Sequence, residues 1–418
     1  MLTIHQAQRS AARSGSRGNP SIGLAIAGGG PVGAVYELGA LRALEESIDG
    51  LRLHELDVYV GVSAGAFLSA SLANRISCTE LCRIFMGTQH AALKFVPELF
   101  LRPAYREYFN RAMQVPGVLR DALLTLIRDP ASASTSELIS ELGRALPSGI
   151  YNNETIHEFL QQSFETAGLG NSFDDLDAKL YVVAVDLDNG KAVRFGSEGH
   201  RDVPISRAVQ ASAALPGLYP PVKIGQRHYV DGALRRTLHA SAALDEGVDL
   251  LLGINPLVPY SADAGEGDDQ GAFHLPVSAL INGGLPLILS QTFRALIQSR
   301  MSVGFKKYRT SHAQADLMLV EPERDDEELF FTNVFSYASR NALCEHAYQA
   351  TRKDLLKRRE DLEPLLAGHG MQLNLERLQQ EDRTLMGSIT HELSGHSRVS
   401  RNLATTLDDL EEMLHAAR

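Results

Sequence analysis

Two short apolar runs near the start of the chain each lead into a glycine-containing turn and then into a helical pattern. Leu24–Ala27 precedes a glycine-rich stretch and apolar residues at helical spacing, and Val58–Val60 precedes a second glycine turn and a run of small residues. Short apolar runs bounded by glycine predict buried strands, and strands that alternate with helices predict a parallel sheet. Residues 20 to 75 are therefore expected to form the first two strand–helix units of an α/β domain.

Further apolar runs extend the predicted sheet. Leu180–Val185 is followed by a turn sequence at Asp186–Gly190 and by Lys191–Phe195, which together predict a hairpin. Tyr229–Asp231 is typical of a short strand, and Leu250–Ile254 of another central strand. A polar residue at a strand end, such as Asp186, could support a site there, although turn formation explains it as well.

Helical patterns occupy two longer stretches. Between about residues 78 and 172 the pattern is mostly helical and predicts an insertion in the α/β domain. Beyond about Phe330, leucines recur at three- and four-residue intervals among charges, which predicts an amphipathic extension. The first 20 residues carry three arginines, no acidic residue and no continuous apolar core. We therefore divide the chain into a disordered lead (1–20), an α/β domain (21–325) and a helical C-terminal extension (326–418).

The pentapeptide Gly61-Val62-Ser63-Ala64-Gly65 directly follows the second predicted strand. A G-x-S-x-G sequence between a strand and a helix places the serine on a sharp turn, where the flanking residues must be small to avoid collisions. The helix that follows would aim its N-terminal dipole at the serine hydroxyl. Because the pattern is short and also occurs by chance, the prediction of Ser63 as a nucleophile depends on this strand, turn and helix order.

The upstream glycine turn has two interpretations. Gly28, Gly30 and Gly33 satisfy the G-x-G-x-x-G fingerprint of FAD- or NAD-binding proteins, which also lies between a strand and a helix. That fingerprint needs an acidic residue at the end of the next strand, where this chain has Ser63 instead; Asp57 stands before that strand. We therefore favour the interpretation of this turn as an oxyanion hole.

An oxyanion hole consists of N–H groups that converge on one developing negative charge. The glycine turn exposes several such groups next to a helix N-terminus, which reinforces them. We expect the N–H groups of Gly29 and Gly30 to donate, with Gly28 in the same turn and with help from the N–H of Ala64.

A serine nucleophile needs a base, and the strongest candidate is acidic. Histidines follow Ser63 at several positions, none of which has a distinctive turn context: His90, His157, His200, His228 and His239. In contrast, Asp231 ends a short strand, and Gly232 after it allows a sharp turn. Asp231 would then project from the carboxyl end of its strand towards Ser63.

Together these segments resemble the patatin-like phospholipase family. Gly28–Gly33 matches its glycine-rich oxyanion segment, Gly61–Gly65 its nucleophile elbow, and Asp231-Gly232-Ala233 its D-G-[GA] motif. Ala211–Val222 looks like the A-S-x-A-x-P block that precedes the aspartate. Pro31 stands where the family usually carries Arg or Lys, a difference that leaves the backbone donors in place.

The resemblance implies a three-layer α/β/α fold with a mainly parallel central sheet, to which this chain adds the helical extension. It also implies a catalytic dyad without histidine, in which Asp231 takes the proton of Ser63 and Ser63 forms an acyl-enzyme. No cofactor and no metal are expected, because backbone donors handle the oxyanion charge. Gly33, Gly61, Gly65 and Gly232 are expected to support the motifs sterically.

Composition and charge limit the partners, disulfides and metal sites that the chain can have. The chain has 418 residues and 44% hydrophobic content, enough for one large core, and its formal net charge of −11 argues against nucleic acid as a partner. Three cysteines (Cys78, Cys82 and Cys344) do not make a disulfide framework. His391 and His396 are five residues apart where a zinc helix needs four, so no metal is predicted there.

Two basic groups could contact an anionic membrane, and each could equally be a solvated helix face. One comprises Arg294, Arg300, Lys306, Lys307 and Arg309; the other comprises Arg352, Lys353, Lys357, Arg358 and Arg359. Acidic neighbours lie close to the second group and make the solvated face the better interpretation there. The longest apolar stretch, Leu275–Leu289, is too interrupted to span a membrane and could be a lid or a buried helix.

We expect a cytoplasmic serine acyl hydrolase acting on phospholipid or lysophospholipid esters, with peripheral membrane association and homo-oligomerisation through the C-terminal helices as further options. A neutral glyceride, a thioester or a polyester are alternative substrates. A dinucleotide-binding protein that uses the glycine fingerprint, and a non-catalytic lipid-binding relative, are the alternatives from other functional classes.

Overall fold

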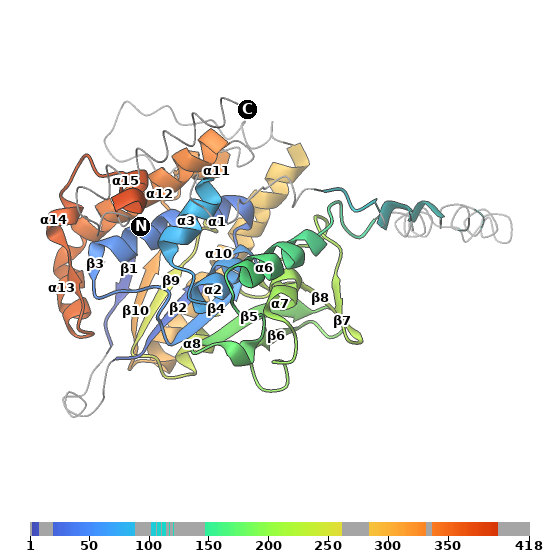
Figure 1. Ribbon diagram of the computed structural model, residues 1–418, viewed down its shortest axis with the longest axis horizontal. Coiled ribbons are helices and arrows are strands. Elements are labelled where there is room, and N and C mark those ends of the chain that lie inside the picture. Colours follow the sequence, from blue (N-terminus) through green and yellow to red (C-terminus); the bar gives the residue numbers. More distant parts are fainter. Residues whose placement is uncertain are drawn as a thin grey trace.

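The computed structural model describes residues 2–7, 20–87, 147–260, 284–331 and 337–391, together with part of the stretch 102–120. Its centre is a nine-stranded sheet in the order β1-β10-β9-β2-β4-β5-β8-β7, with β6 paired to β5 (Figure 1). The strands of this sheet are β1 (Leu2–His5), β2 (Ile22–Ile26), β4 (Val58–Val62), β5 (Lys179–Asp186), β6 (Lys191–Phe195), β7 (Val222–Ile224), β8 (Arg227–Asp231), β9 (Leu250–Ile254) and β10 (Asp316–Val320). A small second sheet pairs β3 (Ile48–Asp49) with β11 (Gln372–Leu373).

The five strands β10, β9, β2, β4 and β5 run parallel to one another, as the alternation of strands and helices predicted. The predicted hairpin is formed by β5 and β6. Antiparallel strands complete the sheet on both sides. β1 lies beside β10, β6 lies on the outer edge of β5, and β8 with its neighbour β7 continues along β5 past the end of β4. The fold is therefore mainly parallel at its centre and antiparallel towards both edges.

Two strands meet end to end along one edge of β5. The pairings of β4 end at Val62 opposite Val183, and those of β8 end at Asp231 opposite Ala184. Because β6 pairs with residues 182–186 on the other edge, β4 and β8 must share the remaining edge. The carboxyl ends of β4 and β8 thus meet on this edge, where they are paired with two adjacent residues of β5.

Helices cover both faces of the sheet (Figure 1). One face and its large core carry α1 (Gly30–Ser47), α2 (Ala64–Ala73), α3 (Cys78–Met86), α6 (Glu154–Thr166), α7 (Ile205–Ser212) and α12 (Tyr337–Lys357). The other face and a smaller core carry α8 (Ser241–Leu244) and α10 (Gly284–Ser311). Leu24 and Ile26 of β2 point into the first core and Ala25 into the second, as the two-residue period of a strand requires. This is the expected three-layer α/β/α architecture.

The C-terminal helical region packs against α1. It comprises α11 (Glu327–Phe331), α12, α13 (Arg359–Ala367), α14 (Leu375–Leu378) and α15 (Leu385–His391). At Gly39, α1 and α12 lie so close together that a Cβ atom added to this glycine would be 2.3 Å from the Cys344 carbonyl oxygen. Near the end of α1, the buried Glu46 carboxylate accepts hydrogen bonds from Tyr348 and Arg383. Apolar packing and an ion pair therefore hold this region on the α/β domain.

The expectation of a disordered lead is wrong for its first residues, because Leu2–His5 forms β1 and pairs with β10. Leu2 is buried, so the edge of the sheet gives this short segment both hydrogen-bond partners and an apolar neighbour. Residues 8–19, most of the predicted insertion, residues 261–283 and those after residue 391 lie outside the described residues. The boundaries proposed between the three parts of the chain stay predictions.

Candidate active site

Ser63 forms the turn between β4 and α2 in a backbone conformation that is rare for residues other than glycine. Its φ of 54° and ψ of −122° fall in a strained region, which costs on the order of 1–3 kcal/mol. The neighbouring glycines leave no space for a side chain. A Cβ atom would lie 2.4 Å from the Cα atom of Ala66 if added at Gly61, and 2.3 Å from the carbonyl oxygen of Ala27 if added at Gly65. The G-x-S-x-G spacing is thus a steric requirement of this turn.

A serine on another helix holds the turn in place. The Ser63 N–H donates a hydrogen bond of 2.8 Å to the hydroxyl of Ser212, and that hydroxyl donates one of 2.6 Å to the Val183 carbonyl. Ser212 is the last residue of α7 and is fully buried. Sequence reasoning noticed Ser212 only as part of the A-S-x-A-x-P block and gave it no role. The structure makes it the link between the Ser63 backbone and β5.

Asp231 ends β8 with its carboxylate directed at Ser63. The Asp231 side chain is 2% exposed, hydrogen-bonds to the Ser63 side chain and accepts a hydrogen bond of 2.8 Å from the Ala233 N–H. Burial raises the pKa of Asp231 to about 6, against the opposing effect of these two hydrogen bonds. The Asp231 N–H donates to the Ala214 carbonyl at 3.0 Å, so the segment that contains Ser212 also fixes the aspartate.

Gly232 allows the chain to turn directly after Asp231. It begins a short 3-10 helix, Gly232–Leu234. A Cβ atom at this position would lie 2.2 Å from the carbonyl oxygen of Val183 and 3.1 Å from a methyl group of Val62. The close contact between the ends of β4, β5 and β8 thus depends on a residue without a side chain.

The upstream glycine turn lies beside the nucleophile. A Cβ atom at Gly28 would lie 3.0 Å from that of Ser63, and one at Gly29 would lie 2.6 Å from both Gly33 and Pro256. Gly30 begins α1 with a φ of +61°, a conformation that glycine adopts readily. Two helix N-termini, of α1 and α2, therefore flank Ser63.

The N–H groups at these two helix ends are available for a ligand. Those of Gly29, Gly30 and Ala64 donate to no backbone acceptor among the described residues, whereas the Gly65 N–H is used by the Ala27 carbonyl at 3.1 Å. Unpaired N–H groups at a helix N-terminus attract a negatively charged oxygen. The structure thus places Ser63 in contact with Asp231 and beside Gly28 of the glycine turn. The role of the N–H groups of Gly29, Gly30 and Ala64 as donors stays a prediction.

The candidate histidines form other contacts. His157 bonds to the Ser206 hydroxyl at 2.7 Å, and His228 lies 3.6 Å from the Asp188 carboxylate. The buried His239 ring hydrogen-bonds to the Gly232 carbonyl, and its Nε2 atom has no hydrogen-bond partner among the described residues. His200 packs edge-on against Phe195, and His90 lies outside the described residues.

Asp186 contributes to the hairpin rather than to the site. Its carboxylate accepts hydrogen bonds from Arg227 at 2.5 Å and from Asn189 at 2.8 Å, and its carbonyl accepts the Gly190 N–H. Of the two interpretations that the sequence left open, the structure supports turn formation.

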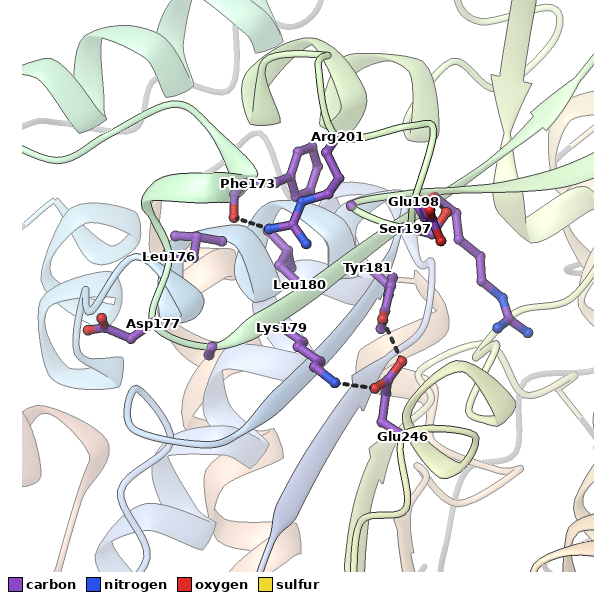
Figure 2. Close-up of a pocket in the computed structure, with 13 residues that line it drawn as sticks. Phe173, Leu176, Asp177, Lys179, Leu180, Tyr181, Ser197, Glu198, Arg201 and Glu246 are labelled. Atoms are coloured by element: carbon purple, nitrogen blue, oxygen red, sulfur yellow. Dashed lines mark hydrogen bonds and ion pairs between the residues drawn. The ribbon is translucent and has the colours of Figure 1, made fainter.

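A pocket of about 570 Å³ lies at the other end of the sheet (Figure 2). Lys179 lines it and pairs in register with Val58, the first residue of β4, whereas Ser63 follows the last. Its cations are already paired. Figure 2 shows Lys179 bonded to Glu246. Arg201 also forms an ion pair, of 2.7 Å, with Asp174, which does not line the pocket. This pocket is therefore separate from the nucleophile.

The described residues contain no group of three or more His, Cys, Asp or Glu side chains placed to hold a metal ion. Cys78, Cys82 and Cys344 are free thiols, fully buried in the core between α1, α3 and α12. Among the helices of the described part of the chain, none is both long and apolar enough to cross a bilayer.

Comparison with solved structures finds several similar proteins at low sequence identity. VipD from Legionella pneumophila is 14% identical, with 86% of this chain and 80% of VipD covered and a TM-score of 0.31. Full-length ExoU from Pseudomonas aeruginosa, in complex with SpcU, is 17% identical with a TM-score of 0.28, and the match covers 72% of this chain and 54% of that one. A second structure of the type III effector ExoU is 16% identical with a TM-score of 0.29, and the match covers 90% of this chain and 68% of that one.

These structural likenesses are too weak to carry a functional assignment, which depends instead on the family comparison. The family model described as patatin-like phospholipase matches residues 24–244, just over half of the chain. The matched segment runs from the middle of β2 to the end of α8 and contains Ser63, Asp231 and the glycine turn. The chain belongs to the patatin-like phospholipase family.

Proposed function

We propose that this protein is a serine acyl hydrolase that cleaves fatty-acyl esters of phospholipids or lysophospholipids through Ser63 and Asp231. Family membership supports lipid acyl hydrolysis as the general activity. The observation that carries the more specific proposal is the contact between a strained serine and a buried carboxylate beside two helix N-termini. Backbone strain at Ser63 and burial of the Asp231 carboxylate both lower the stability of the fold, and the N–H groups at the helix ends, which have no backbone acceptor among the described residues, add nothing to it.

In the first half-reaction, the Ser63 oxygen attacks the ester carbonyl carbon while its proton passes to Asp231. The carbonyl oxygen becomes negatively charged, and the N–H groups of Gly29, Gly30 and Ala64 stabilise it. Collapse of this intermediate breaks the bond to the alcohol, which leaves with the proton held by Asp231. The acyl group stays on Ser63 as an ester.

In the second half-reaction, Asp231 takes a proton from water, and the hydroxide attacks the acyl-enzyme. The bond to Ser63 breaks, the serine oxygen recovers the proton from Asp231, and the fatty acid is released. Both half-reactions thus use one carboxylate as base and then as acid.

The environment of Asp231 suits this role. A carboxylate of ordinary pKa, about 3.9, is a weak base, and a pKa of about 6 makes it roughly 100-fold more basic. At pH 7 about nine-tenths of Asp231 would still be ionised and ready to accept a proton. Burial therefore strengthens the base without neutralising it at physiological pH.

Labelling tests the nucleophile directly. A fluorophosphonate probe followed by peptide mapping should modify Ser63, and Ser63→Ala should prevent labelling and ester hydrolysis. Asp231→Asn should lower kcat on a soluble short-chain ester by at least a factor of about 100, as expected when a general base is lost. Labelling at another serine, or full activity of either variant, would refute the proposal.

Substrate choice is tested separately with matched substrates. A phospholipid, a lysophospholipid, a neutral glyceride and a thioester that share one acyl chain should be hydrolysed at different rates, with the first two preferred. The dinucleotide alternative predicts visible absorbance of the purified protein or a thermal shift with FAD or NAD. Neither signal is expected here, because Ser63 occupies the place of the acidic residue which that site needs.

A further inference from the structure

The helix α10 differs from the rest of the chain in its charge. It is 28 residues long and has five basic residues and no acidic one, whereas the whole protein has a formal net charge of −11. Among the five, Arg300, Lys306 and Lys307 have exposed side chains. A uniformly basic helix on an acidic protein can attract an anionic surface.

Exposed apolar side chains share one side of α10 with these cations. Ile288 is 43% exposed, Leu296 56% and Val303 69%. At about 100° per residue, these three and the three exposed cations fall within an arc of about 120°. The residues that pack into the core beneath the sheet, Met301, Phe305 and Tyr308, fall on the opposite side. The helix therefore has a core-facing side and an outer side that is both basic and apolar.

Within the part of the chain that the structure describes, no carboxylate neutralises the outer cations. Neither Lys306 nor Lys307 forms an ion pair with a described residue. Arg300 donates a hydrogen bond of 3.1 Å to a backbone carbonyl, that of Leu234, and thus keeps its charge uncompensated. By contrast, Lys179 on the far pocket is paired with Glu246. The positive charge of Arg300, Lys306 and Lys307 is accordingly not compensated by any described residue.

The same helix contacts both segments that carry the proposed catalytic groups. Arg294 lies within hydrogen-bonding reach of the Pro256 carbonyl, at 3.4 Å, and Pro256 packs against Gly29 and Gly33 of the glycine turn. The Leu234 carbonyl bonded to Arg300 lies three residues after Asp231. A surface bound to the outer side of α10 would therefore lie beside the active site.

We propose that the outer side of α10, with Ile288, Leu296, Val303, Arg300, Lys306 and Lys307, is the surface through which the protein binds an anionic lipid bilayer. The proposal rests on the proposed lipid hydrolase function and names the partner surface of that site. Cations hold the helix to anionic headgroups, and the apolar side chains enter the interface. Exposed apolar residues distinguish such a surface from a nucleic-acid site, which consists mainly of polar and basic groups.

Vesicle binding by the full-length Ser63→Ala protein tests this surface without hydrolysis of the lipid. We expect sedimentation with vesicles of phosphatidylcholine and phosphatidylserine in equal parts, weakened by high salt, and little sedimentation with phosphatidylcholine alone. Lys306→Gln with Lys307→Gln should weaken binding by about fivefold per lysine, or roughly 30-fold. Leu296→Ser with Val303→Ser should also weaken it.

The second basic group supplies a matched control. Lys353→Gln with Lys357→Gln removes two exposed lysines four residues apart on α12, where Asp354 and Glu360 are close in the sequence. This control should bind anionic vesicles like the parent. Equal losses in the two lysine pairs, no binding by the parent, or equal binding to both vesicle types would overturn the proposal.

A soluble ester separates this inference from the proposed function. With Ser63 intact, Lys306→Gln with Lys307→Gln should keep full activity on a short-chain monomeric ester while losing activity on anionic vesicles. An enzyme inactive on every ester that still binds vesicles through α10 would refute the hydrolase alone. Full activity of this variant on anionic vesicles would refute the α10 surface alone.

Discussion

Val62 and Asp231 lie opposite adjacent residues, Val183 and Ala184, on the same edge of β5. This pairing brings the ends of two strands, 169 residues apart in the sequence, to one point. Ser63 follows Val62 directly, so its side chain meets the Asp231 carboxylate without a long loop on either side. A rigid sheet edge, which positions groups more firmly than loops do, therefore sets the geometry of the proposed dyad.

Ser212→Ala should lower kcat on a soluble ester about tenfold, because the Ser63 N–H loses its hydrogen-bond acceptor and the strained turn can relax. Ser163→Ala is the matched control, since Ser163 donates to a backbone carbonyl on α6 away from the site. Both variants should lose roughly 1 kcal/mol of unfolding free energy. A similar kcat for the two variants would show that Ser212 contributes only to stability.

Gly232→Ala should abolish most activity and lower Tm, because its Cβ atom would lie 2.2 Å from a backbone carbonyl oxygen. We expect the unfolding free energy to fall by about 1–3 kcal/mol or more, the usual effect of overpacking a buried position. Gly304→Ala on α10 has no neighbour within 4 Å and should stabilise the helix by up to about 1 kcal/mol. Thermal unfolding of both variants checks the pair, and a stable, active Gly232→Ala protein would contradict the packing argument.

Asp231 should make activity and stability respond to pH in opposite directions. The pKa of Asp231, raised to about 6, predicts that kcat/KM on a soluble ester falls about tenfold per pH unit below pH 6. An unfolded aspartate has a pKa near 3.9, so the folded state binds this proton more tightly and loses stability as pH rises from about 4 to 6. The loss is on the order of 3 kcal/mol and persists above pH 6.

Asp231→Asn removes this titration. Its unfolding free energy relative to the parent should therefore increase between pH 4 and pH 6.5, while its activity is lost. Urea unfolding at several pH values measures the difference. A constant difference across this range would mean that Asp231 does not have a raised pKa in the folded protein.

The buried Glu37 carboxyl group should lower the unfolding free energy of the protein. It is fully buried on α1, neither carboxylate oxygen has a hydrogen-bond partner among the described residues, and burial raises its pKa well above the ordinary value. Stability should thus fall as pH rises above the unfolded pKa, and Glu37→Leu should stabilise the protein by about 1–4 kcal/mol at pH 8. Glu46→Leu on the same helix should destabilise it, because Glu46 pairs with Tyr348 and Arg383. Urea unfolding that gives the two variants the same sign would contradict this account.

The sequence predicted those parts of the fold that have a local signal. β2, β4, β5 and β9 are short apolar runs next to glycine or turn residues, and the hairpin after β5 has its own turn sequence. Ser63 and its flanking glycines were recognisable because the steric requirements of this turn fall on residues that are adjacent in the sequence.

Contacts between distant segments had no such signal. The role of Ser212 depends on α7 ending beside β5, and the meeting of β4 with β8 depends on which edge of β5 stays open. Leu2–His5 is too short to be predicted as a strand until β10 supplies its partner. Likewise, the charge of α10 was visible in the sequence, but its separation into two sides required the packing of Tyr308 and its neighbours.

The tight contact at Gly39 bears on where this protein can be shortened. A chain that ended at residue 244, where the family match ends, would keep every motif residue but lose β9, which lies beside β2. It would also lose α12, leaving the apolar side of α1 bare. Such a fragment would aggregate when expressed alone, because an open strand edge and an uncovered helix both recruit other copies. The smallest autonomous folding unit must therefore extend at least through α12.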